Sequence, residues 1–305
     1  MFFKKGFQMS ANYHYLREQK EVIASMGQSL LHSFAPFLKK GKQVPALPSE
    51  VQKCQIPPRN NHLIDDYISH VGGSIDAYRL IVPWHFYPQW AVPMVAKLYQ
   101  NIPFNMTRTL NAGCSVIINH QIPRDADLFV KSRLKEIVND ERKILLVAEI
   151  STDTKEHRDA LIVEQKIIIP KRGPSAKKSK KNHIPYHADK IGTLKIPKRS
   201  GLDFALLTGD FNPIHWIPLY AKAMGFESTI AHGFSTMART MELINFEVFE
   251  GDVDRVKSID IRFTRPLRFP ANVDVFIDKN KFFVGHGPGG QAFLMGTYAQ
   301  TEENS

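Results

Sequence analysis

The sequence predicts an α+β fold built from two related copies, each an antiparallel sheet packed on a helix. The first observation is an internal duplication: residues 83–99 (PWHFYPQWAVPMVAKLY) align without gaps on residues 230–246 (IAHGFSTMARTMELINF), which places His85 over His232, 147 positions later (232 − 85). The second is that a helix-like stretch precedes several short strand-like runs in each copy. Strands joined by short turns pair antiparallel, so a parallel α/β sheet is not expected.

The same alignment extends to a strand-like segment. Residues 115–130 (SVIINHQIPRDADLFV) fall on residues 262–277 (RFTRPLRFPANVDVFI), with Asp127 over Asp274. Agreement of pattern across two kinds of element carries more weight than identities at single positions. We therefore expect one tandem duplication.

The organisation of the chain follows from this duplication and from composition. We expect an N-terminal extension at 1–61, the first copy at 62–170, a basic linker at 171–184 and the second copy at 185–305. In the extension a helix is expected at 21–38, with an apolar side that docks on the body of the protein rather than on a membrane. The linker holds much of the net charge of +10 but no aromatic residue to stack on bases, which favours a solvated segment over a nucleic-acid site.

The expected secondary structure is as follows. In the second copy, apolar residues at helical spacing after Gly233 predict a long helix with one buried side. The expected strands of the two copies are 116–118, 127–135, 143–150 and 160–169, then 256–263, 273–277, 281–284 and 292–298.

Bulk composition excludes several classes of protein. The hydrophobic content of 43% is typical of a globular core, and the chain contains no apolar run of membrane-spanning length. The first twenty residues have no apolar stretch that ends at small residues, so a secretory leader is not expected. We therefore expect a cytoplasmic protein without an integral membrane segment. The two cysteines, Cys54 and Cys114, have neither disulfide-framework nor zinc-site spacing.

The chemistry-bearing segment is residues 207–234 (LTGDFNPIHWIPLYAKAMGFESTIAHGF). Asn212 and Pro213 are a favourable helix opening, because Asn caps free N–H groups and Pro suits the first helical position. His215 then falls in the first turn, where it can approach Asp210. The pair has the residue types that acid/base catalysis needs.

The end of this segment adds a hydrogen-bond donor. Pro218 is expected to restart a short helix at 219–224, which Gly225 ends. Gly233 opens the long helix, so its N–H points outward at the positive end of the helix dipole. A developing negative charge is favoured there.

This segment, GDFNPIHWIPLYAKAMGF with IAHGF, resembles the signature of the MaoC-like dehydratases and (R)-specific enoyl-CoA hydratases, a hot-dog-fold family. The segment RFTRPLRFPANV is also similar to the family. The N-terminal half resembles only loosely the degenerate first repeat of double hot-dog members. The resemblance implies two tandem hot-dog repeats, each an antiparallel sheet wrapped around a central helix.

The resemblance also implies roles. Asp210 and His215 would hold the water that adds to the double bond, and the Gly233 N–H would polarise the thioester carbonyl. Asn212, which also supports the pair, would lie against the substrate with His232 and Phe234. No metal and no organic cofactor is implied. Departures from the family pattern are Thr208 in place of Ser, and Trp216 followed by Ile217.

The first copy is expected to be catalytically silent. No GDxNPxxH precedes His85, and Phe86 stands where Gly233 stands in the second copy. We expect His85 to be a satisfied buried histidine without an acid partner.

The function implied is reversible hydration of trans-2-enoyl thioesters, on coenzyme A or acyl carrier protein, to (R)-3-hydroxyacyl thioesters. A hot-dog thioesterase and a non-catalytic acyl-thioester binding protein are the alternatives. The partners expected are thioester substrates and not nucleic acid, with the chain a monomer of two hot dogs or a homodimer.

Three features allow two interpretations. Four aromatic residues of the first copy could line an acyl tunnel or form core: Trp84, Phe86, Tyr87 and Trp90. Three arginines, Arg262, Arg265 and Arg268, could bind phosphate or be ordinary exposed residues. The GHGPGG run at 285–290 superficially resembles a nucleotide loop, but no βα unit follows, so a hairpin turn is expected.

Overall fold

The computed structural model describes residues 13–17, 19, 44–100, 102–106, 109–171 and 182–301. Its main feature is a ten-stranded antiparallel sheet with the order β1-β5-β6-β7-β3-β9-β12-β11-β10-β8. A two-stranded sheet pairs β2 (Ile81–Val82) with β4 (Ile122–Pro123). The large sheet contains β1 (Gln52–Ile56), β3 (Leu110–Ile118), β5 (Leu128–Asn139), β6 (Lys143–Asp153), β7 (Leu161–Pro170), β8 (Asp189–Ile196), β9 (Val256–Phe263), β10 (Ala271–Asp278), β11 (Lys281–Gly285) and β12 (Leu294–Gln300).

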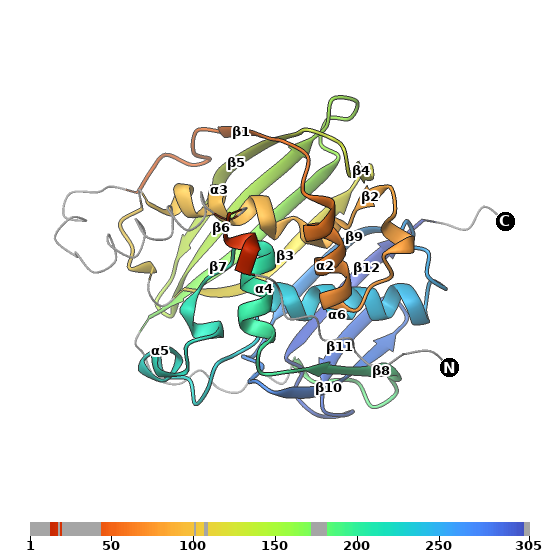
Figure 1. The fold of residues 1–305 in the computed structure, drawn as a ribbon. Helices are drawn as coiled ribbons and strands as arrows, with labels where there is room; N and C mark the ends of the chain where they lie inside the picture. The colour runs from red at the N-terminus through yellow and green to blue at the C-terminus, as the bar shows by residue number, and fades with distance from the viewer. Residues whose placement is uncertain are drawn as a thin grey trace.

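The strand order has an internal symmetry. β3 and β9 pair antiparallel at the centre, with Cys114 opposite Ile261. From this pair outward the order is β7-β6-β5-β1 on one side and β12-β11-β10-β8 on the other. The predicted duplication and the antiparallel α+β architecture are thus confirmed. Figure 1 shows the halves of the sheet, with β5–β7 in yellow-green and β9–β12 in blue.

The helices lie together on one side of the sheet (Figure 1). The two helices that the duplication aligns are α3 (Pro88–Gln100) and α6 (Gly233–Glu247). The others are α2 (Asn61–Val71), α4 (Ser200–Thr208), α5 (Pro218–Ala223) and the 3-10 helices η1 (Tyr13–Arg17), η3 (Asp76–Tyr78), η4 (Trp84–Phe86) and η7 (Pro213–His215).

The sequence predicted a single helix packed on the sheet of each copy, whereas each copy has a further helix: α2 precedes α3, and α4 precedes α6. Helix α2 has a capping Asn60 and a left-handed Gly72 at its end. Helix α4 is buried on nearly every side, so its residues show no one-sided apolar pattern. Helix α5 begins and ends within a residue of the range expected for it.

One hydrophobic core spans both copies. The predicted stripe on α6 is buried, with Met237, Ala238 and Met241 fully inaccessible to solvent. The thiol of Cys114 on β3 lies 3.7 Å from the sulfur of Met237, so the central strand of the first copy packs on the helix of the second. Both cysteines are free.

Residues outside the two copies also contact the body. Strand β1 pairs with β5, the Tyr15 hydroxyl donates to Asp66 at 2.6 Å, and the Gln19 amide donates to the Leu206 and Leu207 carbonyls at 3.3 Å each. The helix expected at 21–38 and most of the expected linker lie outside the described residues. The domain boundaries stay a prediction.

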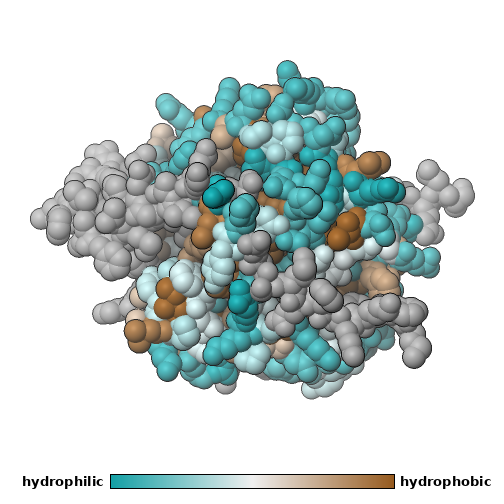
Figure 2. Space-filling model, viewed as in Figure 1, coloured by the Kyte–Doolittle hydropathy of each residue, from teal (hydrophilic) through white to brown (hydrophobic). Residues whose placement is uncertain are grey.

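The surface seen in Figure 2 is mixed, with exposed hydrophobic residues scattered among hydrophilic ones. Two of the exposed hydrophobic residues of the protein are Leu219 and Leu80, whose exposed fractions are 79% and 78%. Among the described residues, no helix combines the length and the hydropathy that a bilayer crossing requires.

Candidate active site

The site begins at the end of α4. Gly209 follows the helix with φ of +82°, a left-handed conformation that glycine adopts without strain, and its N–H donates to the Ala205 carbonyl at 2.8 Å. The chain therefore turns sharply, and Asp210 is presented directly beyond the turn.

Asn212 caps the next turn, as expected from the sequence. Its side-chain oxygen accepts from the Ile214 N–H at 3.3 Å, and Pro213 occupies the first position of η7. The Asn212 N–H in turn donates to a carboxylate oxygen of Asp210 at 3.4 Å. Asn212 thus joins the acid to the turn that carries His215.

His215 is buried, with 8% of its surface exposed. Its Nδ1 atom lies 2.8 Å from the backbone carbonyl of Ile230. Because a carbonyl oxygen can only accept, Nδ1 carries the hydrogen and Nε2 is left as an acceptor. This tautomer suits a group that accepts a hydrogen bond from water.

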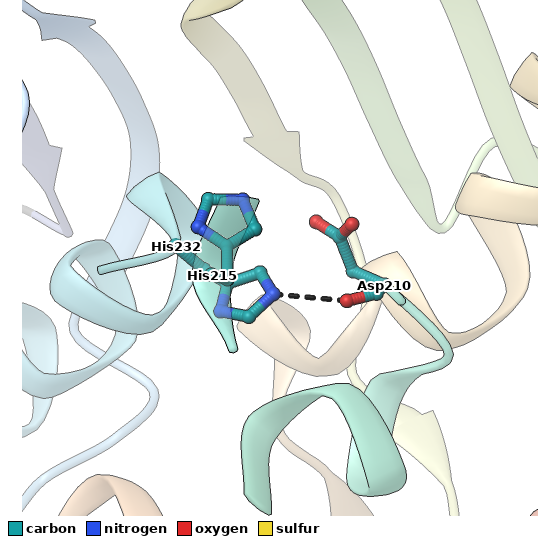
Figure 3. Close-up of side chains that lie close together, drawn as sticks. All are labelled: Asp210, His215 and His232. Carbon is teal, nitrogen blue, oxygen red and sulfur yellow. Dashed lines mark hydrogen bonds between the residues drawn. The ribbon is translucent and has the colours of Figure 1, made fainter. Parts of the chain in front are cut away.

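His232 stacks against His215, with ring centroids 3.7 Å apart, and its ring centroid also lies 4.9 Å from that of Phe204. Its Nε2 atom donates to the backbone carbonyl of Asp210 at 2.9 Å, as Figure 3 shows. The Nδ1 atom is buried and has no hydrogen-bond partner among the described residues. His232 therefore positions both members of the predicted pair.

The three side chains share one small volume. One ligand-type atom from each of Asp210, His215 and His232 lies within 4.8 Å of the others. The Asp210 carboxylate and the two imidazoles are visible side by side in Figure 3. In the part of the chain that the structure describes, this is the one group of such side chains close enough to hold a metal ion.

Burial controls the charge of the site. It raises the pKa of the Asp210 carboxyl, while the nearby His215 and the Asn212 N–H act in the opposite direction. Burial, together with His232, lowers the pKa of His215 to about 3. Burial likewise lowers the pKa of His232 to about 3. Both imidazoles are therefore neutral at physiological pH, and Asp210 is a stronger base than an exposed aspartate.

Gly233 begins α6, so its N–H has no partner within the helix and lies at the positive end of the helix dipole. A Cβ atom at this position would lie 2.8 Å from two atoms of the Phe263 ring. The close approach of Phe263 therefore requires glycine here. Phe263 was not among the predicted site residues, because this contact joins two elements that are distant in the sequence.

Phe234 is almost fully buried, with 2% of its surface exposed. It makes edge-on contacts with Tyr87 of the first copy and Phe263, at centroid distances of 5.4 and 6.0 Å. The four aromatic residues left open in the sequence analysis are also buried: Trp84, Phe86, Tyr87 and Trp90. They form core in this structure. A role for Phe234 in substrate binding stays a prediction.

The expectation that His85 lacks an acid partner was wrong. Its Nε2 atom lies 2.7 Å from a carboxylate oxygen of Glu242. Glu242 is on α6 of the second copy, so no pattern within the first copy could reveal it. The prediction that His85 is buried and satisfied is confirmed, since the Tyr67 hydroxyl also lies 3.0 Å from its Nδ1 atom.

Comparison with known proteins identifies a relationship in the second half of the chain. Residues 180–285 match the family model of the MaoC like domain. The chain is 29% identical over 147 residues to 3-hydroxyacyl-thioester dehydratase X of Mycobacterium tuberculosis, covering 47% of this chain and 50% of that protein. It is 24% identical over 187 residues to a probable enoyl-CoA hydratase 2 of Dictyostelium discoideum, covering 58% and 63%. The chain thus spans about half to three fifths of the length of these two relatives.

Solved structures establish the fold. The crystal structure of HtdX of Mycobacterium tuberculosis superposes with a TM-score of 0.66 at 18% identity, covering 82% of this chain and all of that one (100%). A second protein of Mycobacterium tuberculosis, described as a double hotdog fold, superposes with a TM-score of 0.56 at 10% identity, covering 84% and 97%. The fold is a double hot dog with two tandem repeats, as the sequence predicted.

Proposed function

We propose that the chain catalyses the reversible hydration of trans-2-enoyl thioesters to (R)-3-hydroxyacyl thioesters; the match of residues 180–285 to the MaoC like domain supports this. The proposal depends on one observation: Asp210, with its carboxylate, and His215, whose Nε2 is left as an acceptor, bring ligand-type atoms within 4.8 Å of each other next to His232, the residue before Gly233. The names of the two relatives, a dehydratase and a hydratase, support the same reaction.

The two side chains have different parts in the proposed mechanism. A water bound between them donates one hydrogen to Asp210 and one to His215 Nε2, so that its oxygen faces C3 of the substrate. Asp210 is the proton carrier, because its pKa is raised, whereas an imidazole with a pKa of about 3 does not hold a proton at neutral pH. Such acid/base action contributes about 10²- to 10⁴-fold to the rate.

In the proposed addition, one O–H bond of the water is broken, and a C–O bond and a C–H bond are formed. The water oxygen forms a bond to C3, the π electrons move toward the thioester carbonyl, and Asp210 takes the proton that the water loses. Asp210 then returns this proton to C2, which restores the carboxylate. The Gly233 N–H donates to the carbonyl oxygen while it carries negative charge; a donor of this kind is worth about 10²- to 10³-fold. Dehydration follows the same steps in reverse.

The test is loss of enoyl absorbance with a trans-2-enoyl-CoA. Asp210→Asn and His215→Ala should each reduce the rate by at least about 10²-fold. Matched controls are the exposed residues Asp189 and His62, whose Asn and Ala variants should keep full activity. Undiminished activity in both site variants would exclude the proposed roles. Release of free thiol without hydration would indicate the thioesterase alternative, and acyl-CoA binding without turnover would indicate a binding protein.

One chain supplies both hot dogs of the site, and Tyr87 of the first repeat packs on Phe234 of the second. A monomer is thus the sufficient unit in this proposal, with a homodimer as the alternative that sedimentation would detect. A cytoplasmic location stays a prediction from the sequence.

A further inference from the structure

Arg265 is an exposed arginine held beside the start of α6. Two residues before it, the ring of Phe263 fills the space next to Gly233. Two residues after it, the Leu267 carbonyl accepts from the Ala231 N–H at 2.7 Å. Both contacts are made with the short segment from Ala231 to Gly233, whose last N–H group is the one proposed to bind the thioester carbonyl. The backbone of Arg265 is therefore confined to the edge of the site.

The side chain of Arg265 has a defined place. Its guanidinium carbon lies 5.8 Å from the centre of the Phe293 ring, and the N–H groups of Thr264 and Arg265 donate to the Phe293 carbonyl at 2.9 and 3.3 Å. The imidazole of His286, from the GHGPGG run, meets the same ring edge-on at 5.3 Å. We call Arg265, His286 and Phe293 the Arg265 patch.

The charge of the patch is not neutralised by the described residues. Arg265 forms no ion pair with any of them, whereas Arg268 on the same segment is paired with Glu227. Asp274 interacts with His286 but already accepts from Lys190 at 2.8 Å. The patch therefore presents a positively charged guanidinium, packed against the Phe293 ring, at the edge of the site.

We propose that the Arg265 patch binds the phosphate end of a phosphopantetheine arm whose thioester is held at Gly233. This inference rests on the proposed function. A carbonyl bound by the Gly233 N–H leaves the sulfur and its arm to run outward over the surface, and the first charged group along that arm is a phosphate. The planar guanidinium matches the geometry of a phosphate group and can donate two hydrogen bonds to it. Coenzyme A and acyl carrier protein share this chemistry.

The test compares one acyl group on carriers with and without phosphate. With trans-2-enoyl-CoA, Arg265→Ala should raise KM about five- to tenfold and leave kcat unchanged, because a charge-assisted contact at an exposed edge is lost. With the N-acetylcysteamine thioester, which has no phosphate, KM should not change. Arg265→Lys should give an intermediate KM with the coenzyme A ester. Raising the salt concentration should weaken binding of the coenzyme A ester more in the parent protein than in Arg265→Ala.

Arg268→Ala is the matched control, because it removes an exposed arginine of the same segment whose charge Glu227 already offsets. It should leave both KM values unchanged. An equal rise in KM for Arg268→Ala, an equal rise with the N-acetylcysteamine ester, or no rise with the coenzyme A ester would overturn the inference.

Acyl carrier protein esters distinguish the two phosphate sources. A matching rise in KM with the carrier-protein ester supports binding of the phosphate of the shared arm. A rise confined to coenzyme A would overturn the inference, because it would assign the patch to the phosphates of the nucleotide portion. If the parent protein hydrates none of these esters, the proposed function fails; titration calorimetry with free coenzyme A then tests the patch alone. Equal affinity of the parent protein and Arg265→Ala, or no binding by the parent protein, would refute it.

Discussion

His85 of the first repeat and Glu242 of the second form a buried pair, with His85 Nε2 2.7 Å from Glu242 Oε1 and side-chain exposures of 0% and 5%. The hydroxyl of Tyr78 donates to the same carboxylate oxygen at 2.7 Å, and the Tyr67 hydroxyl lies 3.0 Å from the other ring nitrogen. The carboxylate also fills the space beside Gly73, where a Cβ atom would lie 2.7 Å from Glu242 Cδ. This network joins the first repeat to the helix that begins at Gly233.

Replacing Glu242 should therefore destabilise the whole protein. Glu242→Ala leaves the His85 nitrogen and the Tyr78 hydroxyl buried without an acceptor, which costs about 3 kcal/mol in the free energy of unfolding. Glu242→Gln keeps an acceptor oxygen and should cost less. Urea unfolding measures both. Glu247→Ala, an exposed position on the same helix, should stay within about 0.5 kcal/mol of the parent protein. A loss of under 0.5 kcal/mol in Glu242→Ala would show that the network does not stabilise the fold.

Gly233→Ala should lower kcat more than it raises KM. The added methyl group meets the Phe263 ring at 2.8 Å, so either the ring or the helix start must move. A displacement of the carbonyl-binding N–H by about 1 Å can cost about 10²-fold in rate. Steady-state kinetics with a trans-2-enoyl-CoA measures the effect. The double variant with Phe263→Ala restores the space, so it should recover part of the kcat; full activity in Gly233→Ala alone would contradict the proposed role.

The acid limb of the pH profile should report Asp210. Activity needs the carboxylate form, so kcat/KM falls as pH decreases through the pKa of Asp210, which burial raises above 3.8. His215, with its pKa lowered to about 3, stays neutral throughout this range. A plot of log kcat/KM against pH gives the midpoint. We expect it above 3.8, whereas a midpoint near 6.5, the ordinary value for histidine, would assign the limb to an imidazole instead.

Metal removal should leave the activity unchanged. The cluster of Asp210, His215 and His232 has the dimensions of a metal site, yet the proposed reaction uses only a carboxylate, an imidazole and a backbone N–H. Dialysis against a chelator, followed by elemental analysis and hydration kinetics, tests this expectation. Activity that is lost on chelation and restored by a divalent ion would replace the proposed mechanism with one in which the metal activates the water.

The local parts of this protein could be predicted from its sequence. The turn that carries Asp210 and His215 depends on Gly209, Asn212 and Pro213, which act on φ, ψ and hydrogen bonds within a few residues. The start of α6 at Gly233 and the strands of both repeats were likewise predicted from patterns that extend over only a few neighbouring residues. Helix α2 was missed although it carries an apolar stripe, and α4 was missed because burial on nearly every side removes the stripe.

Only the tertiary structure decided which distant groups meet. Ile230 sets the tautomer of His215, the stacking of His232 on His215 completes the site, and the ring of Phe263 makes glycine necessary at position 233. Glu242 reaches His85 from the other repeat. Such contacts depend on how the sheet and the helices pack, and sequence spacing carries no information on that packing. The sequence by itself thus determined the two repeats and the turn that carries Asp210 and His215, while packing determined the environment that sets the charge and orientation of these proposed catalytic groups.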